Sequence, residues 1–328
     1  MDIPGIVEGL KRVFTQKYGS HITISNLKDI TVGWETQIIA FDLEENGKQH
    51  ELVARIFSSD QTGNRAAEEF IVMQRLHDTG YPVPKVYFYE KDPQVIGSPF
   101  LIMERIEGGV LWDVFFNSSH DKRDEVMDLS TKLMVDLHSI DPSKVFKIKK
   151  GYTTKNRIND RLSIESKTLI KFGLHNEFKS LIDWLTVGLS ELVESPLCIL
   201  HGDFHPRNIL LRKDASPVVI DWSSCSLGDF REDLCWTGLL AYAFINSELK
   251  NGVYKSYQSY SSRSIDNLQY FEVFSGLRRL SDFSISMKAG AEARGMRAEA
   301  SSQMYENRAH VEKIRDIILE ITGLNLKA

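Results

Sequence analysis

Three polar side chains that lie close together in the chain, Asp203, Asn208 and Asp221, carry the functional groups that phosphoryl transfer requires. In such a reaction one carboxylate accepts the proton of the attacking hydroxyl, while a second carboxylate and an amide oxygen hold the Mg²⁺ that bridges the nucleotide phosphates. Mg²⁺ prefers hard oxygen ligands, which Asp and Asn provide. We therefore expect Asp203 to be the catalytic base, and Asn208 and Asp221 to bind the metal.

Short apolar runs are expected to position these side chains. Cys198-Ile199-Leu200 leads into the loop that contains Asp203. Two further apolar runs, 209–211 and 217–220, flank Lys213-Asp214-Ala215-Ser216, which is typical of a hairpin turn. The loop, the hairpin and the second carboxylate are thus predicted to form one compact segment.

The two histidines of the loop are given supporting roles. His201 is expected to orient the loop rather than to react. His205 is expected to pack or hydrogen-bond within the loop, because Asp203 already fills the role of base and no second His or Cys stands nearby at metal-ligand spacing.

The stretch from His201 to Trp222 resembles the catalytic segment of the aminoglycoside phosphotransferase family, which are small-molecule kinases with the protein-kinase fold. Protein kinases carry His-Arg-Asp with a downstream Asn in the same frame, followed by Asp-Phe-Gly. This chain has Gly202 in place of that Arg, and Ile220-Asp221-Trp222 in place of Asp-Phe-Gly, and both departures favour the small-molecule branch. A second similarity follows in the Gly-Asp and Asp-Leu pairs of 227–234. The resemblance spans roughly residues 25 to 240.

The resemblance implies an α+β, two-lobed protein-kinase-like fold with a small antiparallel sheet in the N-lobe and a mainly helical C-lobe. The domains would be an N-terminal nucleotide-binding lobe over 1–103, a hinge over 104–109, and a C-terminal helical lobe over 110–328 that carries the catalytic and metal-binding loops. The implied activity is transfer of the γ-phosphate of ATP or GTP to a hydroxyl of a small molecule, with Mg²⁺ as cofactor.

The N-terminal part of the chain matches this expectation. Apolar residues at helical spacing predict an amphipathic helix over 3–18. Asn46-Gly47 between two β-type runs predicts a two-residue hairpin. The strand Leu52-Val53-Ala54-Arg55-Ile56 has Arg55 where protein kinases have a phosphate-binding Lys, and a guanidinium also binds phosphate oxygens. The alternative is a solvent-facing strand arginine.

The partner of Arg55 is expected on the helix predicted over 65–78. Glu68 and Glu69 are both candidates, and only one of two neighbours on a helix can face the cleft. We choose Glu69 as the partner. The alternative is that both glutamates are solvated charges on the helix surface. In the resembling family such a glutamate stabilises the phosphate-binding side chain.

Two further nucleotide contacts are predicted on weaker patterns. Gly33 is the only glycine of a possible phosphate loop, and it equally fits an ordinary turn. Main-chain groups of Glu104, Arg105 and Ile106, before the Gly108-Gly109 pair, are expected to hold the adenine edge, as the resemblance implies. The alternative is a plain glycine-containing loop.

Helical patterns dominate after Leu111, with predicted helices that include 124–138, 177–192, 233–244, 265–295 and 303–323. Residues 144–160 are basic and are expected to be irregular and solvated, with binding of an anionic acceptor as the alternative. Asp233 is expected to cap its helix or to brace the catalytic loop. Arg278 and Arg279 are expected to be surface charges, or else to face the substrate.

Bulk properties exclude several classes of partner. The chain has 328 residues, a net charge of −5 and no basic run that stands out, which argues against a nucleic-acid partner. No apolar run reaches the roughly 18 residues of a membrane span. The three cysteines have neither metal-like nor disulfide-like spacing, which favours a reducing, cytoplasmic location. We expect a monomer or homodimer that acts on a small molecule.

Three other hypotheses remain open. The acceptor is not specified by the sequence, so the chain is alternatively a kinase of a metabolite such as a sugar, choline or homoserine. A nucleotide-binding pseudokinase is compatible with the single glycine and with Arg55, although such a protein has no need of Asp203 as a base. A helical binding protein that is not a kinase would make the matched spacing of Asp203, Asn208 and Asp221 a coincidence.

Overall fold

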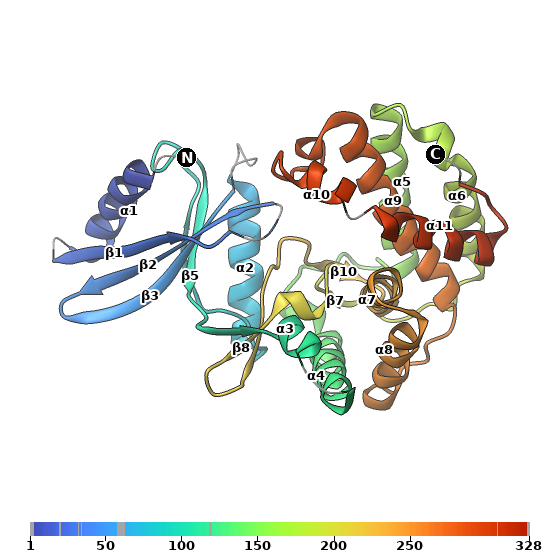
Figure 1. Ribbon diagram of the computed structural model, residues 1–328, viewed down its shortest axis with the longest axis horizontal. Helices are drawn as coiled ribbons and strands as arrows, with labels where there is room; N and C mark the ends of the chain where they lie inside the picture. Colours follow the sequence, from blue (N-terminus) through green and yellow to red (C-terminus); the bar gives the residue numbers. More distant parts are fainter. Residues whose placement is uncertain are drawn as a thin grey trace. The chain divides into compact units, whose positions relative to one another are not determined.

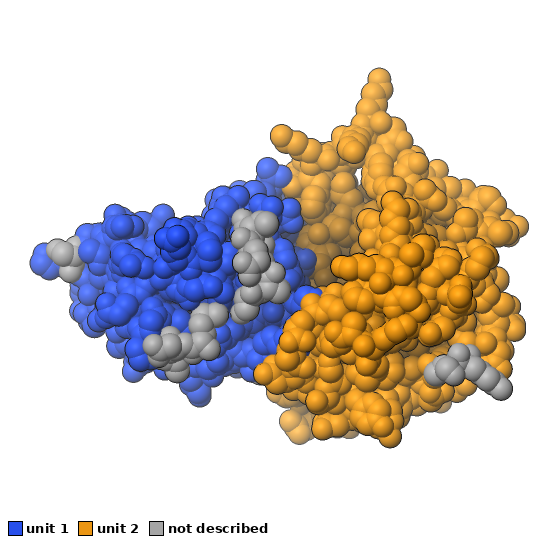
Figure 2. Space-filling view, turned by 90° about the horizontal axis from the view of Figure 1, so that it is seen from above, with its two compact units in different colours: residues 1–108, 210–223, 295–297 blue, residues 109–209, 224–294, 298–328 orange. Residues whose placement is uncertain are grey.

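The protein divides into two compact units, which are described in turn. The structure is a computed structural model that describes residues 3–19, 21–31, 33, 35–57, 63–117, 120–306 and 308–326. Unit 1 contains residues 1–108, 210–223 and 295–297, and unit 2 contains 109–209, 224–294 and 298–328 (Figure 2). The segment that carries Asp221 therefore belongs to unit 1, whereas Asp203 and Asn208 belong to unit 2.

Unit 1 is built on a five-stranded antiparallel sheet with the strand order β1-β2-β3-β5-β4 (Figure 1). Its elements are α1 (Ile3–Tyr18), β1 (Ile22–Asp29), β2 (Gln37–Glu45), β3 (Lys48–Ile56), α2 (Asn64–Asp78), β4 (Val86–Glu90) and β5 (Phe100–Glu104). Asn46 and Gly47 both have positive φ, at 51° and 78°, so the predicted two-residue hairpin joins β2 to β3. This hairpin fixes the register that pairs Ile38 with Arg55.

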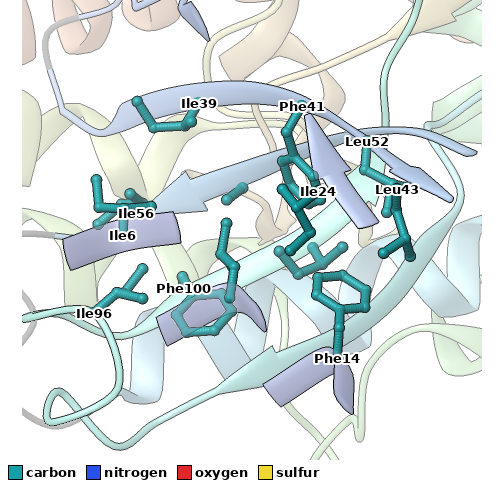
Figure 3. Close-up of a cluster of buried hydrophobic side chains, with 13 residues drawn as sticks. Ile6, Phe14, Ile24, Ile39, Phe41, Leu43, Leu52, Ile56, Ile96 and Phe100 are labelled. Atoms are coloured by element: carbon teal, nitrogen blue, oxygen red, sulfur yellow. The ribbon is translucent and has the colours of Figure 1, made fainter. Parts of the chain in front are cut away.

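Apolar side chains of α1 and of one sheet face form the core of unit 1 (Figure 3). Ile6, Leu10 and Phe14 recur at helical spacing and are all at most 1% exposed. Phe14 packs edge-on against Phe41, with ring centroids 5.8 Å apart. The predicted N-terminal helix thus covers the sheet and leaves its other face available for polar side chains.

A second, three-stranded sheet has the order β6-β8-β9 and includes the predicted hairpin. Its strands are β6 (Gly108–Val110), β8 (Ile209–Arg212) and β9 (Pro217–Val219). Ala215 has a φ of 64° and the N–H of Arg212 donates to the carbonyl of Ser216, which closes the turn. A Cβ at Gly108 would lie 1.6 Å from the carbonyl oxygen of Leu211, so only glycine allows this close approach.

Unit 2 is mainly helical, as predicted. Its elements are α3 (Leu111–Phe116), α4 (His120–Ser139), α5 (Thr154–Lys171), α6 (His175–Gly188), β7 (Cys198–Leu200), β10 (Ser226–Gly228), α7 (Phe230–Phe244), α8 (Ser247–Tyr260), α9 (Leu268–Ala289), α10 (Ala300–Glu306) and α11 (Ala309–Thr322), with short 3₁₀ turns at Pro142–Lys144, Leu189–Glu191, Pro206–Asn208 and Ala291–Arg294. Strands β7 and β10 pair antiparallel and hold the start of the loop that contains Asp203. No helix within the described ranges is long and apolar enough to cross a membrane.

Two expectations for unit 2 were wrong in part. Residues 144–160 are not irregular throughout, because α5 begins at Thr154. The side chain of Thr153 accepts from the N–H of Asn156 and the Asn156 side chain accepts in return, a capping box that basic composition conceals. The cap of α7 is Asp229 rather than Asp233, with Glu232 completing a capping box.

Candidate active site

The predicted base Asp203 lies in a network of hydrogen-bond donors in unit 2. Its Oδ1 accepts from the indole Nε1 of Trp236 at 2.7 Å. Its Oδ2 lies 3.4 Å from Nε2 of His205 and 3.4 Å from Nδ2 of Asn208, which also donates to the Asp203 carbonyl at 2.9 Å. The structure thus brings Asp203 and Asn208 together, and 32% of the Asp203 side chain stays exposed for contact with a ligand.

The pKa of Asp203 is well below its usual range. Burial acts to raise that pKa, but the positive charge and hydrogen bond of His205, together with the charges of Arg278 and His201, outweigh it. The carboxylate is therefore ionised at neutral pH. A carboxylate with so low a pKa is a weak base, so its main contribution would be to orient the acceptor hydroxyl and to take its proton late in the transfer.

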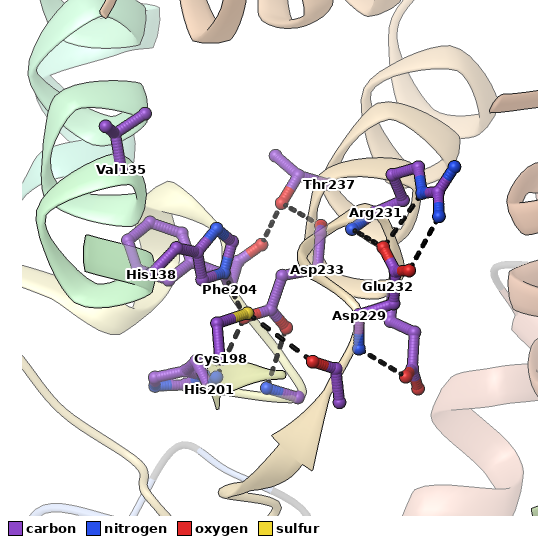
Figure 4. Close-up of polar contacts among 12 residues, drawn as sticks. Val135, His138, Cys198, His201, Phe204, Asp229, Arg231, Glu232, Asp233 and Thr237 are labelled. Carbon is purple, nitrogen blue, oxygen red and sulfur yellow. Dashed lines mark hydrogen bonds and ion pairs between the residues drawn. The ribbon is translucent and has the colours of Figure 1, made fainter. Parts of the chain in front are cut away.

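Side chains of α7 hold the loop that contains Asp203 by hydrogen bonds (Figure 4). The Asp233 carboxylate accepts the backbone N–H groups of His201 and Gly202, both at 2.8 Å, and also contacts Nε2 of His138 at 3.2 Å. The hydroxyl of Thr237 donates to the carbonyl of Phe204 at 2.6 Å. Asp233 thus braces the loop, which is the second of the two roles that the sequence allowed.

The conformation of the loop itself depends on two residues before Asp203. His201 is fully buried, and its Nδ1 accepts the backbone N–H of Asp203 at 3.2 Å, so it orients the loop as expected. Gly202 has a φ of 81°, and a Cβ there would lie 2.5 Å from the carbonyl oxygen of Ser224. The departure from the His-Arg-Asp pattern of protein kinases therefore has a steric reason in this chain.

A second cluster of charged groups lies in unit 1 around Arg55. The side chain is 6% exposed and faces away from solvent, so the alternative of an exposed strand arginine is wrong. Its Nε lies 3.2 Å from Oε1 of Glu69, and its Nη2 donates to Oδ1 of Asp221 at 2.7 Å. Glu69 is buried while Glu68 is exposed, so the structure places the chosen glutamate against Arg55.

Carboxylates outnumber guanidinium groups in this cluster. Among the described residues, Glu35, Glu69 and Asp221 lie near two guanidinium groups, those of Arg55 and Arg65, and Arg65 contacts Glu35 at 2.5 Å. Burial raises the pKa of Glu69 to about 7, although Arg55 opposes the shift. Burial and the charge of Asp221 also raise the pKa of Glu35. An added cation would relieve this surplus of negative charge.

The donor groups present are compatible with Mg²⁺. Asp221 has a φ of 67°, a conformation that is uncommon for a non-glycine residue and concentrates at functional sites. Asn208 uses its Nδ2 for the loop, so its amide oxygen is the atom with lone pairs to offer a metal. No group of three or more His, Cys, Asp or Glu that could hold a metal occurs within the ranges described.

The predicted adenine-binding segment lies in unit 1 and begins at Glu104, the last residue of β5. The Glu104 carboxylate forms a two-pronged ion pair with Arg212, at 2.6 and 3.0 Å. Arg105 contacts Asp42 at 2.9 Å. The backbone N–H groups of Glu104 and Arg105 donate to carbonyls of neighbouring segments, whereas Ile106 lies in neither β5 nor β6. Side chains and sheet bonds thus fix the first two residues, and Ile106 is the one whose backbone stands outside the sheet.

Gly33 shows no steric requirement for glycine. A Cβ at this position would meet nothing within 4 Å, and its carbonyl accepts from Nη2 of Arg297 at 2.8 Å. Its neighbours Val32 and Trp34, which complete the predicted phosphate loop, lie outside the described residues. The choice between a phosphate-binding and a turn glycine therefore stays a prediction.

Two residues near Asp203 were not correctly predicted from the sequence. Trp236 was not proposed, and Arg278 was expected to be a surface charge or to face the substrate. Trp236 lies three residues after Asp233 on α7, so helical spacing turns both toward the same loop, and this period was the available signal. Arg278 is not a surface charge: its guanidinium lies 4.1 Å from the centroid of the Trp236 ring and donates to the carbonyl of Gly202. Arg279 is also buried. No local pattern marks an arginine on a distant helix as part of the loop.

Comparison with known proteins identifies relatives of this arrangement. The family model described as "Phosphotransferase enzyme family" matches residues 26–263. A "Probable acyl-CoA dehydrogenase IBR3" of Arabidopsis thaliana is 28% identical over 188 residues, which are 54% of this chain and 23% of that protein. "Acyl-CoA dehydrogenase family member 11" of Mus musculus is 28% identical over 180 residues, with coverages of 53% and 23%. The match therefore spans about a quarter of these relatives' length.

Solved structures share the fold. A Ralstonia eutropha protein assigned to the aminoglycoside phosphotransferases is 22% identical, with a TM-score of 0.65 over 94% of this chain and 98% of that chain. A complex of APH(4)-Ia with AMP-PNP and hygromycin B is 16% identical, with a TM-score of 0.65 over 96% and 100%. The GDP and kanamycin complex of APH(2")-IIIa is 17% identical, with a TM-score of 0.59 over 95% and 98%. The predicted α+β kinase-like fold is thereby confirmed.

Proposed function

Because the chain belongs to the phosphotransferase enzyme family, we propose that it transfers the γ-phosphate of ATP or GTP to a hydroxyl group of a small molecule. The observation that carries this proposal is the geometry of the loop. An ionised Asp203 is held by Trp236, and Asn208 lies next to it on the same loop. A carboxylate kept ionised and partly exposed beside an amide ligand is what hydroxyl activation in phosphoryl transfer requires.

The reaction proposed here assigns each group one task. The acceptor oxygen forms a bond to the γ-phosphorus as the bond from that phosphorus to the β–γ bridging oxygen breaks, so the nucleoside diphosphate leaves. The hydroxyl proton passes to the carboxylate of Asp203. Asn208 and Asp221 would hold Mg²⁺, which when bound neutralises charge on the phosphates. Arg55, fixed by Glu69, would orient phosphate oxygens.

The nucleotide is expected to bind unit 1. In this proposal the backbone around Glu104, Arg105 and Ile106 contacts the base, within a hinge over 104–109 between a nucleotide-binding lobe and a helical lobe. APH(4)-Ia and APH(2")-IIIa have been solved with AMP-PNP and with GDP. Both adenine and guanine nucleotides are therefore reasonable donors for this chain, and main-chain recognition by itself favours neither.

A nucleotide-binding pseudokinase is the second candidate, and one observation favours it. Asp221 gives one carboxylate oxygen to Arg55 at 2.7 Å, which is an oxygen that a metal ligand would otherwise offer to Mg²⁺. A protein that binds nucleotide without metal could keep this ion pair. A metabolite kinase for a sugar, choline or homoserine belongs to the same reaction class as the main proposal and differs from it only in the acceptor.

A thermal-shift titration with ATP and with GTP, each with and without Mg²⁺, separates the two candidates. A ligand that binds the folded state stabilises it by mass action and so raises the melting temperature. At a ligand concentration one hundred times Kd, the free energy of unfolding increases by about 2.7 kcal/mol. A shift that requires Mg²⁺ supports the phosphotransferase, and a shift of equal size without Mg²⁺ supports the pseudokinase. No shift with either nucleotide at millimolar concentration contradicts both.

A further inference from the structure

A pocket in unit 2 is lined by two residues, Trp236 and Arg278, that also act on Asp203. It lies among α5, α7 and α9, and the charged and aromatic residues on its walls are Arg161, Glu165, Glu232, Trp236, Phe274 and Arg278. Apolar contact is supplied by Leu162 and Leu277. Trp236 and Arg278 also belong to the environment of Asp203, so a molecule in this pocket would lie next to the catalytic carboxylate.

Arg161 lines the pocket without a direct ion pair or hydrogen bond to another described residue. The carboxylates of Glu232 and Glu165 are near enough to act on its charge, but neither contacts it directly. Burial lowers its pKa, and the positive charges of Arg278 and Arg157 lower it further. Two of these guanidinium groups, those of Arg161 and Arg278, line the pocket, where an anion would stabilise the charged form of both.

The acidic residues of the pocket are already engaged in the protein. Oε1 of Glu165 accepts from the hydroxyl of Ser281 at 2.5 Å, and its Oε2 lies 3.7 Å from Nη2 of Arg294. Oε1 of Glu232 accepts the N–H of Asp229 in the capping box of α7. Burial raises the pKa of Glu232, although the charges of Arg157 and Arg161 oppose the shift, and the raised pKa weakens its attraction for a cation. The pocket is therefore better suited to bind an anion than to bind an ammonium group.

We propose that the acceptor is an anionic alcohol, specifically an aliphatic hydroxycarboxylic acid, whose carboxylate binds Arg161 and Arg278 while its hydroxyl faces Asp203. A guanidinium binds a carboxylate through two parallel hydrogen bonds. Leu162, Phe274 and Leu277 would contact the aliphatic part, which favours such an acid over a sugar phosphate. This inference rests on the proposed function for the transfer step, but the binding of the acid does not.

The same geometry argues against a polycationic acceptor. An aminoglycoside carries several ammonium groups, and these would meet Arg161 and Arg278 with like charge. Like charges brought together at a binding site cost several kcal/mol. The structures solved with hygromycin B and kanamycin are 16% and 17% identical to this chain. At such low identity the fold is shared, but the acceptor can differ.

The first experiment compares matched acceptors in an assay of nucleoside diphosphate release with ATP and Mg²⁺. The panel contains aliphatic hydroxycarboxylic acids of several chain lengths, the diol and the amino alcohol that correspond to each acid, a sugar phosphate, and kanamycin. We expect at least one acid to exceed its diol in kcat/KM by about tenfold or more, which corresponds to one good charged contact. A diol, an amino alcohol, a sugar phosphate or kanamycin as the best acceptor overturns the inference.

Substitutions at Arg161 then locate the carboxylate. Arg161→Gln is expected to raise KM for the best acid about tenfold or more while kcat changes little, and Arg161→Lys is expected to recover part of the loss. Lys167→Gln is the matched control, because Lys167 is an exposed cation on the same helix α5. An unchanged KM in Arg161→Gln contradicts the assignment, as does an equal rise in Lys167→Gln.

Binding without turnover keeps this inference distinct from the proposed function. The same acids are titrated in a thermal-shift assay without nucleotide, against wild type and Arg161→Gln. Protection of the wild type that is lost in Arg161→Gln supports the anion site even if no phosphate is transferred, in which case the proposed function fails alone. Protection that is absent, or equal in both proteins, overturns the anion site even if Mg²⁺-dependent nucleotide binding supports the phosphotransferase.

Discussion

The two units hold their functional carboxylates in opposite electrostatic conditions. In unit 2, Asp203 is surrounded by donors and positive charge, from Trp236, His205 and Arg278, and its pKa is depressed. In unit 1, Glu35, Glu69 and Asp221 interact with Arg55 and Arg65, and the pKa values of Glu35 and Glu69 are raised. Donors and cations surround the single carboxylate of Asp203, whereas the named groups of the unit 1 cluster comprise three carboxylates and two guanidinium groups.

This difference follows from how the chain assembles each cluster. The groups around Asp203 lie on its own loop and on the two helices α7 and α9. The cluster of unit 1 joins strand β3, helix α2 and the segment after β9, and its surplus charge is of the sign that a divalent cation neutralises. We infer that unit 2 is prepared for the acceptor, whereas unit 1 depends on the metal–nucleotide complex to complete its charge balance.

Asp203→Asn provides the largest test of the contrast. The amide cannot take the hydroxyl proton, so we expect kcat to fall by about 10²- to 10⁴-fold while the Mg²⁺-dependent nucleotide shift survives. Steady-state transfer rates and thermal shift measure the two effects. Asp136→Asn, an exposed carboxylate on α4 of the same unit, is the control that should leave both unchanged. Full turnover in Asp203→Asn would show that Asp203 is not the base.

Arg55→Gln tests the cluster of unit 1. It removes the cation that contacts both Glu69 and Asp221, which leaves buried carboxylate charge without its partner. We expect a loss of about 3 kcal/mol in the free energy of unfolding, measured by denaturant titration, together with loss of the nucleotide-dependent shift. Arg55→Lys should recover only part, since an ammonium cannot present separate Nε and Nη donors to two carboxylates.

The control for this substitution is Arg12→Gln. Arg12 is exposed on α1 of the same unit and donates only to the carbonyl of Val95 at 3.1 Å. Its loss is expected to cost less than about 1 kcal/mol. Equal destabilisation in the two variants would contradict the claim that Arg55 balances buried charge.

The two clusters were not equally predictable from the sequence. The contacts of Asp203 with Asn208, and of Arg55 with Glu69, follow from motif spacing and from helical period, which are local properties. The direct ion pair of Arg55 with Asp221 joins positions far apart in the chain, and so does the contact of Arg278 with the loop. Such pairs depend on how elements pack, which a single sequence does not encode in any short pattern.

In the fold, too, local features were predicted from the sequence and long-range contacts were not. The hairpin at Asn46-Gly47 and helix α1 follow from turn chemistry and apolar period, and both were predicted. Helix α5 was missed because its first turns are basic and its capping box uses Asn156 in place of the usual Glu or Gln. The placement of residues 210–223 in unit 1 depends on tertiary contacts, such as the bond from the N–H of Val219 to the carbonyl of Pro82.

Glu69 should make the stability of unit 1 depend on pH, because its pKa is raised in the folded protein. Its pKa is about 7 in the folded state and near 4.3 when unfolded, so the folded state binds the extra proton between these values. The stability is therefore fully present below about pH 4 and is lost as pH rises to about 7, by at most about 4 kcal/mol. Denaturant titrations across this pH range measure the slope.

Two neighbouring substitutions isolate this slope. Glu69→Gln removes the titrating group, so the fall in stability between about pH 4 and 7 should flatten. Glu68→Gln, at an exposed position on the same helix, should keep the wild-type slope. Identical slopes in both variants would assign the pH dependence to another group and remove the charge surplus as its explanation.

The smallest expected effects come from removing one neutral donor from each cluster. Trp236→Phe keeps the aromatic wall but deletes the 2.7 Å hydrogen bond to Asp203, and Ser223→Ala deletes the 3.1 Å hydrogen bond to Asp221. A hydrogen bond to a charged group contributes about 1.5–3 kcal/mol where it is well formed, so we expect Trp236→Phe to lower kcat/KM by about tenfold. Ser223→Ala should change it by less than about threefold, because Mg²⁺ would replace the weaker donor at Asp221. A larger effect of Ser223→Ala would mean that the protein, rather than the metal, balances the charge of unit 1.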